Sequence, residues 1–291
     1  MIPAFVLLKG DIMKTVILTD STCDIKREYL DTLDVKAVPL KVIFGQESFL
    51  DGIDLTKKEF FEKLAASDVN PTTSQPSPED FLTLFETYRQ QGAQIVYIGI
   101  SSVLSGTVQS AKIAKEMCGY NQIYIVDSLT TTAGLELLVR EACKMRDSGM
   151  PARDIASEIE KLVPKTRVYA YVDTLKYLVR GGRLSKTAGA LGGALGIKPL
   201  ITVADGSVAS IGTARGQKNA FEKLCEIVKT ADIDTDRPMV LTFTENEENM
   251  HMLEMYMQEK GVVYPWLYSE VGSVIGTHVG PGAAAAAYFV K

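Results

Sequence analysis

The sequence has few of the residues that build metal sites or disulfide frameworks. Its 291 residues include four cysteines, with no Cys-x-x-Cys pair, and two histidines, His251 and His278, which lie far apart and belong to no His-Glu-x-x-His cluster. Structural and catalytic zinc sites are usually built from such clusters. We therefore expect no metal site, and we expect the cysteines to be the reduced thiols of a cytoplasmic protein.

Long apolar runs and an excess of positive charge are absent as well. No apolar run reaches the roughly 18 to 20 residues that span a bilayer. The short apolar segment 2–8 lacks the basic flank and the cleavage site of a signal peptide. With a net charge of −5, the chain has no general attraction to nucleic acid or to anionic membranes. We expect a cytoplasmic protein with no integral membrane segment and no nucleic-acid partner.

The first half of the chain contains a regular alternation of strand and helix patterns. The predicted strands cover residues 15–19, 95–100 and 122–127, and the predicted helices cover residues 78–91, 105–117 and 131–147. Such alternation is typical of a parallel, doubly wound sheet between two layers of helices. Ligands of these sheets bind at the carboxyl ends of the strands, where Asp20 and the segment after Ile100 lie.

The second half has a different pattern, which predicts an α/β domain with a mixed sheet. Asp205-Gly206 separates two β-rich runs and predicts a two-residue hairpin turn. The alanine-rich residues 283–287 are expected to form a tightly packed helix. We expect an N-terminal domain at residues 14–165, a C-terminal domain at residues 166–291, and a leader at residues 1–13.

Three hydroxyls and a glycine stand where the strand 95–100 gives way to a helix, in the order Ser101-Ser102-Val103-Leu104-Ser105-Gly106. Unpaired backbone N–H groups and the positive end of the helix dipole are expected at such a junction, which suits a small anion. The loop has no lysine, and this favours a carboxylate over a phosphate. The alternative is that Ser105 or Ser102 merely caps the helix.

A second hydroxyl cluster, residues 72–77, precedes the helix 78–91. Ser77 is explained as the N-cap of that helix, because Pro78 and acidic residues follow it. Thr73 and Ser74 are not needed for capping and are candidates for a ligand contact. Asp20 after the first strand is either a helix cap or a carboxylate in a pocket wall.

Two further motifs combine glycine with a functional side chain. Arg180-Gly181-Gly182-Arg183 places two guanidinium groups near each other, which suits a phosphate or carboxylate, although a solvated turn would also explain it. His278-Val279-Gly280-Pro281-Gly282 allows close backbone approach beside a histidine. His278 could donate a hydrogen bond to an anion or act as a base, or it could be structural.

In this order the motifs resemble the DegV family of bacterial fatty-acid-binding proteins, over residues 14–291. The matching segments are Thr19-Asp20-Ser21-Thr22, Thr73-Ser74-Gln75-Pro76-Ser77, Ser101-Ser102-x-Leu104-Ser105-Gly106-Thr107, Leu178-x-Arg180-Gly181-Gly182-Arg183-x-Ser185, Lys198-Pro199 and Thr277-His278-x-Gly280-Pro281-Gly282. The resemblance implies two α/β domains and a buried long-chain fatty acid. It also implies a protein without catalysis or cofactor of its own, which presents the acid to a separate ATP-dependent kinase subunit that forms an acyl phosphate for phospholipid synthesis.

The resemblance also implies roles for individual residues. Thr73 and Ser105 would hydrogen-bond the carboxylate of the fatty acid. Ser74 and Ser102 would line the same place, with His278 beside the head group. Arg183 and Arg215 would face the kinase partner or the phosphoryl group.

Two other functions remain open from the residues. A serine hydrolase could use Ser105 or Ser102 with His278, and an acid such as Asp20 would complete it. The order Gly99-Ile100-Ser101-Ser102-Val103 is not the usual Gly-x-Ser-x-Gly elbow, which weakens this alternative. A nucleotide-binding module is weakened by the lack of Gly-x-Gly-x-x-Gly and of a phosphate-binding Gly-Lys-Ser/Thr loop.

Overall fold

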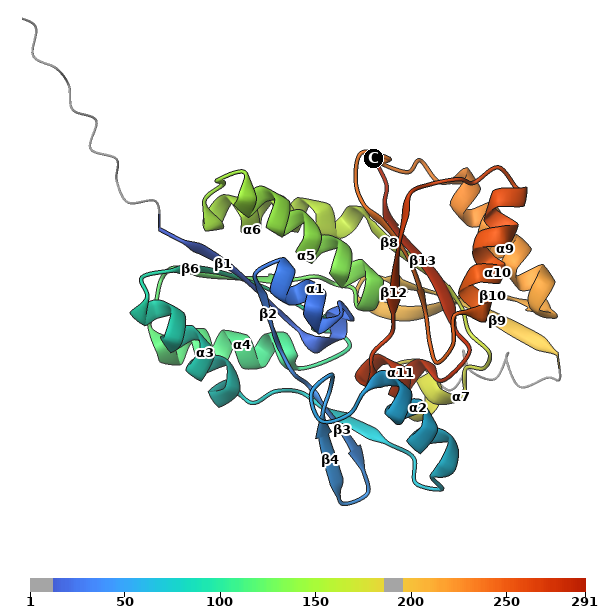
Figure 1. The fold of residues 1–291 in the computed structure, drawn as a ribbon, viewed down its shortest axis with the longest axis horizontal. Helices are drawn as coiled ribbons and strands as arrows, with labels where there is room; N and C mark the ends of the chain where they lie inside the picture. Colours follow the sequence, from blue (N-terminus) through green and yellow to red (C-terminus); the bar gives the residue numbers. More distant parts are fainter. Residues whose placement is uncertain (1–12, 186–195) are drawn as a thin grey trace, which may run out of the picture.

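The computed structural model describes residues 13–185 and 196–291 (Figure 1). Most of the predicted leader, residues 1–12, therefore lies outside the described residues. The structure is a mixed α/β fold with a parallel four-stranded sheet and a separate mixed six-stranded sheet, as the sequence predicted. Among the described residues, no helix combines the length and the hydrophobicity needed to cross a bilayer.

The first sheet has four parallel strands in the order β2-β1-β6-β7. They are β1 (Thr15–Asp20), β2 (Val35–Val38), β6 (Gln94–Gly99) and β7 (Ile123–Asp127). The chain leaves β1 for β2 on one side and returns to β6 on the other, so the carboxyl ends of β1 and β6 are adjacent. Ligand sites of doubly wound folds form at such a change of direction.

Helices cover both faces of this sheet. The helices α3 (Pro78–Gln90) and α4 (Thr107–Cys118) lie on one face, and α5 (Thr132–Asp147) and α6 (Ala152–Leu162) lie on the other (Figure 1). Leu18 and Ile95 pack toward the first pair, whereas Ile17 and Val96 pack toward the second. The strands are apolar on both sides for this reason, which explains why short continuous apolar runs predicted them well.

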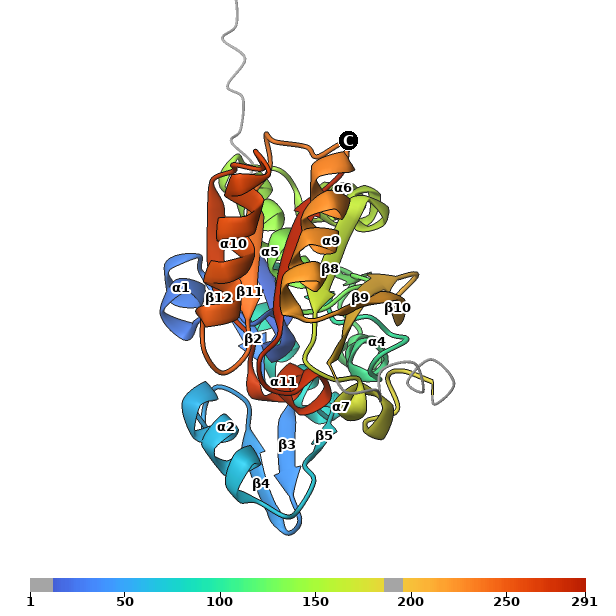
Figure 2. The same ribbon diagram turned by 90° about the vertical axis from the view of Figure 1, so that its right-hand side faces the viewer.

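The second sheet has the order β10-β9-β8-β13-β11-β12, and its neighbours are antiparallel except β11 and β12. The strands are β8 (Thr166–Tyr171), β9 (Ile197–Ala204), β10 (Ser207–Arg215), β11 (Met239–Phe243), β12 (Trp266–Glu270) and β13 (Ala284–Phe289). The helices α9 (Gln217–Thr230) and α10 (Glu248–Glu259) pack on one face through a buried apolar cluster (Figures 1 and 2).

The hairpin turn between β9 and β10 is confirmed. Asp205 and Gly206 both have positive φ angles, 49° and 79°, as a tight two-residue turn between twisted strands requires. The expected helix at residues 283–287 is wrong, because residues 284–287 belong to β13 and Ala283 directly precedes it. Strand β13 pairs with β8 and β11 in the interior of the sheet, and this pairing overrides the helix propensity of alanine.

A small third sheet stands apart from the other two. It contains β3 (Lys41–Phe44), β4 (Glu47–Leu50) and β5 (Thr72–Ser74), and the helix α2 (Lys57–Ala66) packs beside it. This unit reaches the short helix α11 (Ser273–Val279) through an apolar cluster that includes Val42, Phe60 and Ile275 (Figure 2). The early chain segment 41–74 therefore contacts the end of the chain.

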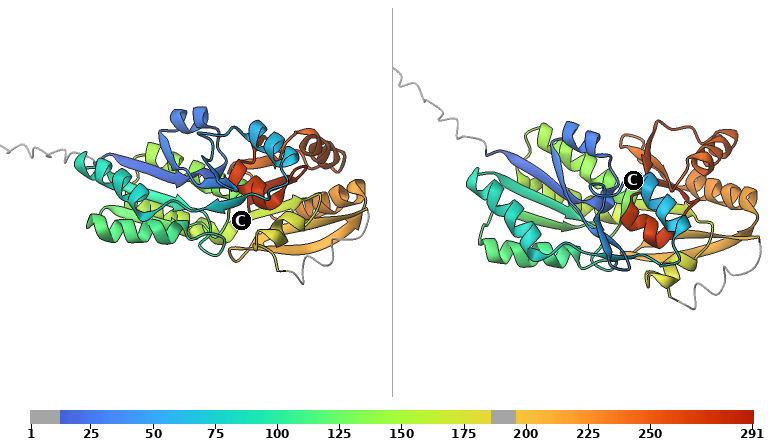
Figure 3. Two further views of the ribbon diagram at one scale, coloured as in Figure 1. Left: turned by 90° about the horizontal axis from the view of Figure 1, so that it is seen from below. Right: turned by 60° about the horizontal axis from the view of Figure 1, so that its bottom comes forward.

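One helix connects the two larger sheets. Helix α5 packs against β1 and β6 of the first sheet and also against β8, β11 and β13 of the second (Figure 3). The same buried cluster contains Ile17, Leu138 and Val240, which come from β1, α5 and β11. The two sheets therefore share part of their core. The domain boundary between residues 165 and 166 stays a prediction.

Candidate functional site

A cavity lies on the face of the six-stranded sheet that α9 and α10 do not cover. The short helices α7 (Lys176–Arg180) and α11 form its roof. It has two parts, with about 520 Å³ and 460 Å³ of empty space, a figure that includes space open to solvent. The parts are adjacent, because five residues line both, namely Thr131, Leu178, Val208, Ile275 and Val279.

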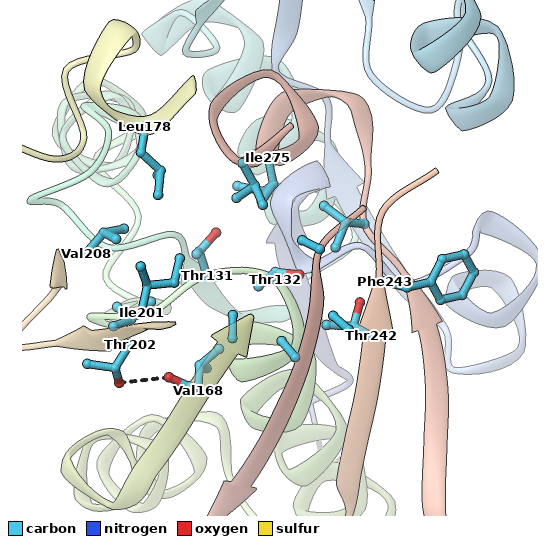
Figure 4. A pocket seen from close by; sticks show the side chains of 17 residues that line it. Thr131, Thr132, Val168, Leu178, Ile201, Thr202, Val208, Thr242, Phe243 and Ile275 are labelled. Carbon is cyan, nitrogen blue, oxygen red and sulfur yellow. Dashed lines mark hydrogen bonds between the residues drawn. The ribbon is translucent and has the colours of Figure 1, made fainter. Parts of the chain in front are cut away.

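The larger part is almost entirely apolar. Leu178 and Ile275 point from the roof toward the sheet, where Ile201 and Val168 lie opposite them (Figure 4). Residues 283–285, at the start of the central strand β13 and just before it, also line this part, and their small alanine side chains leave room above the sheet. A narrow apolar space of this kind suits a flexible hydrocarbon chain.

The smaller part ends in four polar side chains from separate elements. Thr73 comes from β5, Ser105 from the loop before α4, Arg183 from the segment after α7, and His278 from α11. The imidazole Nε2 of His278 lies 2.9 Å from Thr73 Oγ1. Residues that are up to 205 positions apart thus form one polar end of the cavity.

His278 is held as a neutral side chain. Burial, together with the nearby guanidinium groups of Arg183 and Arg180, lowers its pKa from 6.5 to about 4. Gly181 makes this close packing possible, because a Cβ at that position would lie 2.2 Å from His278 Nδ1. At neutral pH the imidazole therefore offers one N–H donor and one acceptor, and no charge.

Two buried carboxylates fix the helix that carries His278. The backbone N–H groups of Gly272 and Ser273 donate to Asp24 Oδ1 at 2.8 Å and to Asp51 Oδ1 at 3.0 Å. Burial raises the pKa of Asp24 to about 7, and the pKa of Asp51 is raised for the same reason. These contacts anchor the N-terminus of α11 to loops of the first half of the chain.

The Ser101 loop contributes one hydroxyl to the cavity. Ser105 Oγ lies 2.8 Å from Thr107 Oγ1, and Gly106, not Ser105 or Ser102, occupies the N-cap position of α4. The capping alternative for these two serines is therefore wrong. Ser101 is fully buried and donates to the carbonyl of Gly206 at 2.7 Å, so it joins the loop to the β9–β10 turn.

The expectation of free backbone N–H groups is wrong for residues 102–105 of this loop. The amides of Ser102 and Val103 donate to Asp127 Oδ1 and Ser101 Oγ, and those of Leu104 and Ser105 donate to the Ser101 carbonyl. These hydrogen bonds hold the loop around Ser101 and occupy the backbone N–H groups of residues 102–105. Ser105 is the serine of this loop that lines the cavity.

Arg183 lies beside this polar end and is held by backbone carbonyls. Its Nε donates to the carbonyl of Leu104 at 3.1 Å, and its Nη1 donates to that of Gly181 at 2.6 Å. Arg180 is directed elsewhere, with its guanidinium 4.8 Å from the ring centre of Tyr177. Of the two arginines in the motif, Arg183 is the one that lines the cavity.

The structure does not bring three of the predicted residues to the cavity lining. Ser102 is exposed, and Ser74 lies beside Thr73 with its hydroxyl directed to the carbonyl of Gln75 at 3.4 Å. Arg215 is exposed at the end of β10 and lines a different surface depression. Alternation along β5 explains Ser74, because neighbouring side chains of a strand point to opposite faces.

Asp20 has a structural position. Its fully buried carboxylate accepts hydrogen bonds from Thr22, from the Tyr97 hydroxyl at 2.9 Å and from the Ile100 amide at 2.8 Å. It caps the 3-10 turn Ser21–Cys23, so the interpretation of Asp20 as a helix cap is confirmed. Neither Ser105 nor Asp20 is hydrogen-bonded to His278 in the described structure, so no hydrolase triad is assembled.

Comparison with known proteins identifies the family of this chain. The family model described as "Uncharacterised protein, DegV family" matches residues 14–291. This chain belongs to the DegV family. A DegV domain-containing protein from Caldanaerobacter subterraneus is 36% identical over 272 residues, which cover 93% of this chain and 97% of the relative. One from Clostridium acetobutylicum is 34% identical, over 96% of this chain and 99% of the relative.

Solved DegV structures have the same fold. A DegV family protein from Thermus thermophilus, described by its fatty acid binding, matches with a TM-score of 0.86 and 30% identity, over 96% of this chain and 100% of that chain. DegV of Bacillus subtilis, described as a fatty acid binding protein, matches with a TM-score of 0.83 and 29% identity, also over 96% of this chain and 100% of that chain. A stearic acid-binding protein from Eubacterium ventriosum matches with a TM-score of 0.83 and 27% identity, over 95% of this chain and 98% of that chain.

The apolar lining of this DegV chain is the part that the sequence motifs missed. Leu178 and Ile201 come from α7 and β9, and Ile275 and Ala285 come from α11 and β13. These residues have the same local signal as any buried apolar residue. Only the packing of the roof over the sheet distinguishes them. Among the described residues, no cluster of histidine, cysteine and acidic side chains could hold a metal ion.

Proposed function

We propose that this protein binds a long-chain fatty acid, with the carboxylate at the polar end of the cavity and the acyl chain in its apolar part. The observation that carries the proposal is the pair of adjacent cavity parts, of which one has polar side chains and the other has apolar walls. The fatty acids bound by the solved DegV proteins of Thermus thermophilus and Bacillus subtilis support it.

Energetics favour such a ligand. A palmitate-sized chain buries roughly fifteen methylenes at ~0.8 kcal/mol each, a gross gain on the order of 10 kcal/mol. Losses in translational and chain freedom cancel much of this gain. The carboxylate must still find donors, because an unpaired buried charge is costly. Thr73, Ser105 and His278 supply neutral donors, and Arg183 supplies positive charge nearby.

We further propose that the protein has no catalysis of its own and presents the carboxylate to a separate ATP-dependent kinase subunit in the cytoplasm, which forms the acyl phosphate used in phospholipid synthesis. Two hydroxyls and a neutral imidazole can hold the carboxylate without a bidentate ion pair, so its oxygens stay available as nucleophiles. Arg183 lies beside this end and is the candidate contact for the partner or the transferred phosphoryl group.

The lipid proposal is tested by mass spectrometry of the purified, denatured protein. We expect a long-chain fatty acid in the wild type and a greatly reduced amount in the variant with Thr73→Ala and Ser105→Ala. Ser102→Ala is the matched control, because it removes an exposed serine of the same loop. Full lipid retention in the double variant would contradict the head-group assignment, and lipid-free wild-type protein that also binds no added fatty acid would contradict the whole proposal.

The presenting role is tested by acyl phosphate formation with a fatty acid kinase subunit and ATP. We expect turnover to require this protein, and we expect Arg183→Ala to lower turnover while lipid binding is retained. Arg215→Ala is measured beside it, because Arg215 was predicted from the family resemblance but lies outside the cavity lining. Full turnover with Arg183→Ala would refute its assignment.

A further inference from the structure

A second hydroxyl stands behind the hydroxyl of Ser105, on the first residue of α4. Thr107 is fully buried and is not among the residues that line either part of the cavity. Its Oγ1 lies 2.8 Å from Ser105 Oγ, and within residues 13–185 and 196–291 the Thr107 side chain makes no other hydrogen bond. Any influence of the Thr107 hydroxyl on the cavity therefore passes through Ser105.

Helix capping does not account for the buried hydroxyl of Thr107, because Gly106 holds the N-cap position of α4. Valine has nearly the same shape as threonine and would fill this space without a polar atom to satisfy. A buried hydroxyl costs free energy unless it is hydrogen-bonded. The contact with Ser105 is thus what the Thr107 hydroxyl supplies.

The direction of the hydrogen bond between Thr107 and Ser105 matters for the cavity. Each hydroxyl has one hydrogen to donate and can also accept. If Thr107 donates, the hydrogen of Ser105 stays free for a group in the cavity. If Ser105 donates, it presents only lone pairs to the cavity, and the Thr107 hydrogen is left without an acceptor in a fully buried place. An unpaired buried donor is costly, so the first arrangement is favoured.

We propose that Thr107 is a positioning residue that holds the Ser105 hydroxyl as a donor to the carboxylate of the bound fatty acid. The inference rests on the proposed function and adds to it a residue that does not touch the ligand. A carboxylate only accepts hydrogen bonds and therefore requires Ser105 to donate, whereas an alcohol can accept or donate. Thr107 thereby favours a fatty acid over the alcohol of the same chain length.

The test compares palmitic acid with 1-hexadecanol on protein from which co-purified lipid has been removed. Both affinities are measured by competition against one fluorescent fatty acid, and the readout is their ratio, because a general loss of packing weakens both ligands alike. In Thr107→Val we expect the affinity for the acid to fall about threefold to tenfold relative to the alcohol. Thr107→Ser keeps the hydroxyl and should keep the wild-type ratio.

Two further variants show whether Thr107 acts through Ser105. Thr19→Val is the matched control, because Thr19 is also fully buried, its hydroxyl donates to the carbonyl of Ile98 at 2.9 Å, and it does not line the cavity. It should leave the affinity ratio unchanged. In the Ser105→Ala background, Thr107→Val should lower the ratio no further, because the residue through which it acts is gone.

The outcomes separate this inference from the proposed function. If the wild type binds neither ligand, the proposed function fails and the inference fails with it. If the wild type binds palmitic acid and the ratio in Thr107→Val is unchanged or raised, the inference is wrong and fatty acid binding stands. An equal fall in Thr19→Val, or in the Ser105→Ala background, would also overturn it. If circular dichroism shows that Thr107→Val is unfolded, Thr107→Ala removes the same hydroxyl and carries the same expectation.

Discussion

The two large sheets differ in how their faces are covered. The four-stranded sheet has long helices on both faces, and its strands bury bulky side chains such as Leu18 and Ile95 against them. The six-stranded sheet has α9 and α10 on one face. On its other face α5 covers one part, and small residues such as Ala285 lie beneath two short helices in the other part. The first sheet thus has a filled interior and the second encloses a cavity.

This difference shows how a cavity is encoded. A bulky residue at the centre of β13 would fill the space between the sheet and the roof, and the protein would gain packing and lose the cavity. Short helices add to the effect, because α7 and α11 cover the sheet with few side chains. The predictions below test this contrast between a filled face and an open one.

The largest expected effect comes from truncating matched isoleucines on the two sheets. Ile95→Ala removes a fully buried side chain from the filled face, and we expect it to lower the free energy of unfolding by about 2–5 kcal/mol. Ile201→Ala should cost only about 1–2 kcal/mol, because Ile201 borders space that is already unfilled. Urea unfolding of both variants measures the difference, and equal losses would contradict the contrast.

Filling the open face should abolish ligand binding while the fold is kept. Ala285→Leu places a larger side chain in the cavity, and we expect lipid affinity to fall about a hundredfold or more, a loss of ~2.7 kcal/mol or more. The measurement is fatty acid titration combined with circular dichroism. Ala209→Leu, at a partly exposed position of β10 outside the cavity lining, is the control and should bind normally.

Acidification should weaken the protein through the polar end of the open face. The folded-state pKa of His278 is about 4, below its ordinary value of 6.5, so the unfolded state binds the proton more readily. The contribution of neutral His278 to the free energy of unfolding is therefore fully present above pH 6.5. It is lost as the pH falls toward 4, and the loss is about 2 kcal/mol at pH 5. Unfolding free energies of the wild type and His278→Gln from pH 7.5 to 5 test this, and parallel curves would refute it.

The smallest expected effect concerns the glycine that packs against His278. In Gly181→Ala the added Cβ would meet Nδ1, so the imidazole should shift away from Thr73 and lipid affinity should fall about tenfold, ~1.4 kcal/mol. The control is Gly182→Ala, where no atom lies within 4 Å of the added Cβ although φ is positive. If the control lowers affinity as much, backbone strain and not the histidine contact would be responsible.

Much of the fold and part of the site could be predicted from the sequence. Local patterns predicted β1, β6, the Asp205-Gly206 turn and the capping of α3 by Ser77, because each depends on neighbours in the chain. The β13 strand was predicted as a helix, because an alanine run has the same local preference wherever its partners lie. The short helix α11 was missed for a similar reason, since its contacts are with residues far away in the sequence.

For the site, the sequence by itself determined which side chains are chemically suited to hold an anion. Hydroxyls at Thr73 and Ser105, a histidine at 278 and an arginine at 183 stand in motifs that no simple cap explains. Only the tertiary structure decided that these four meet at one end of one cavity, and that Ser74, Ser102 and Arg215 do not line it. The physical reason is that a cavity is defined by the packing of distant elements and by the small residues between them, and neither leaves a local signal in the chain.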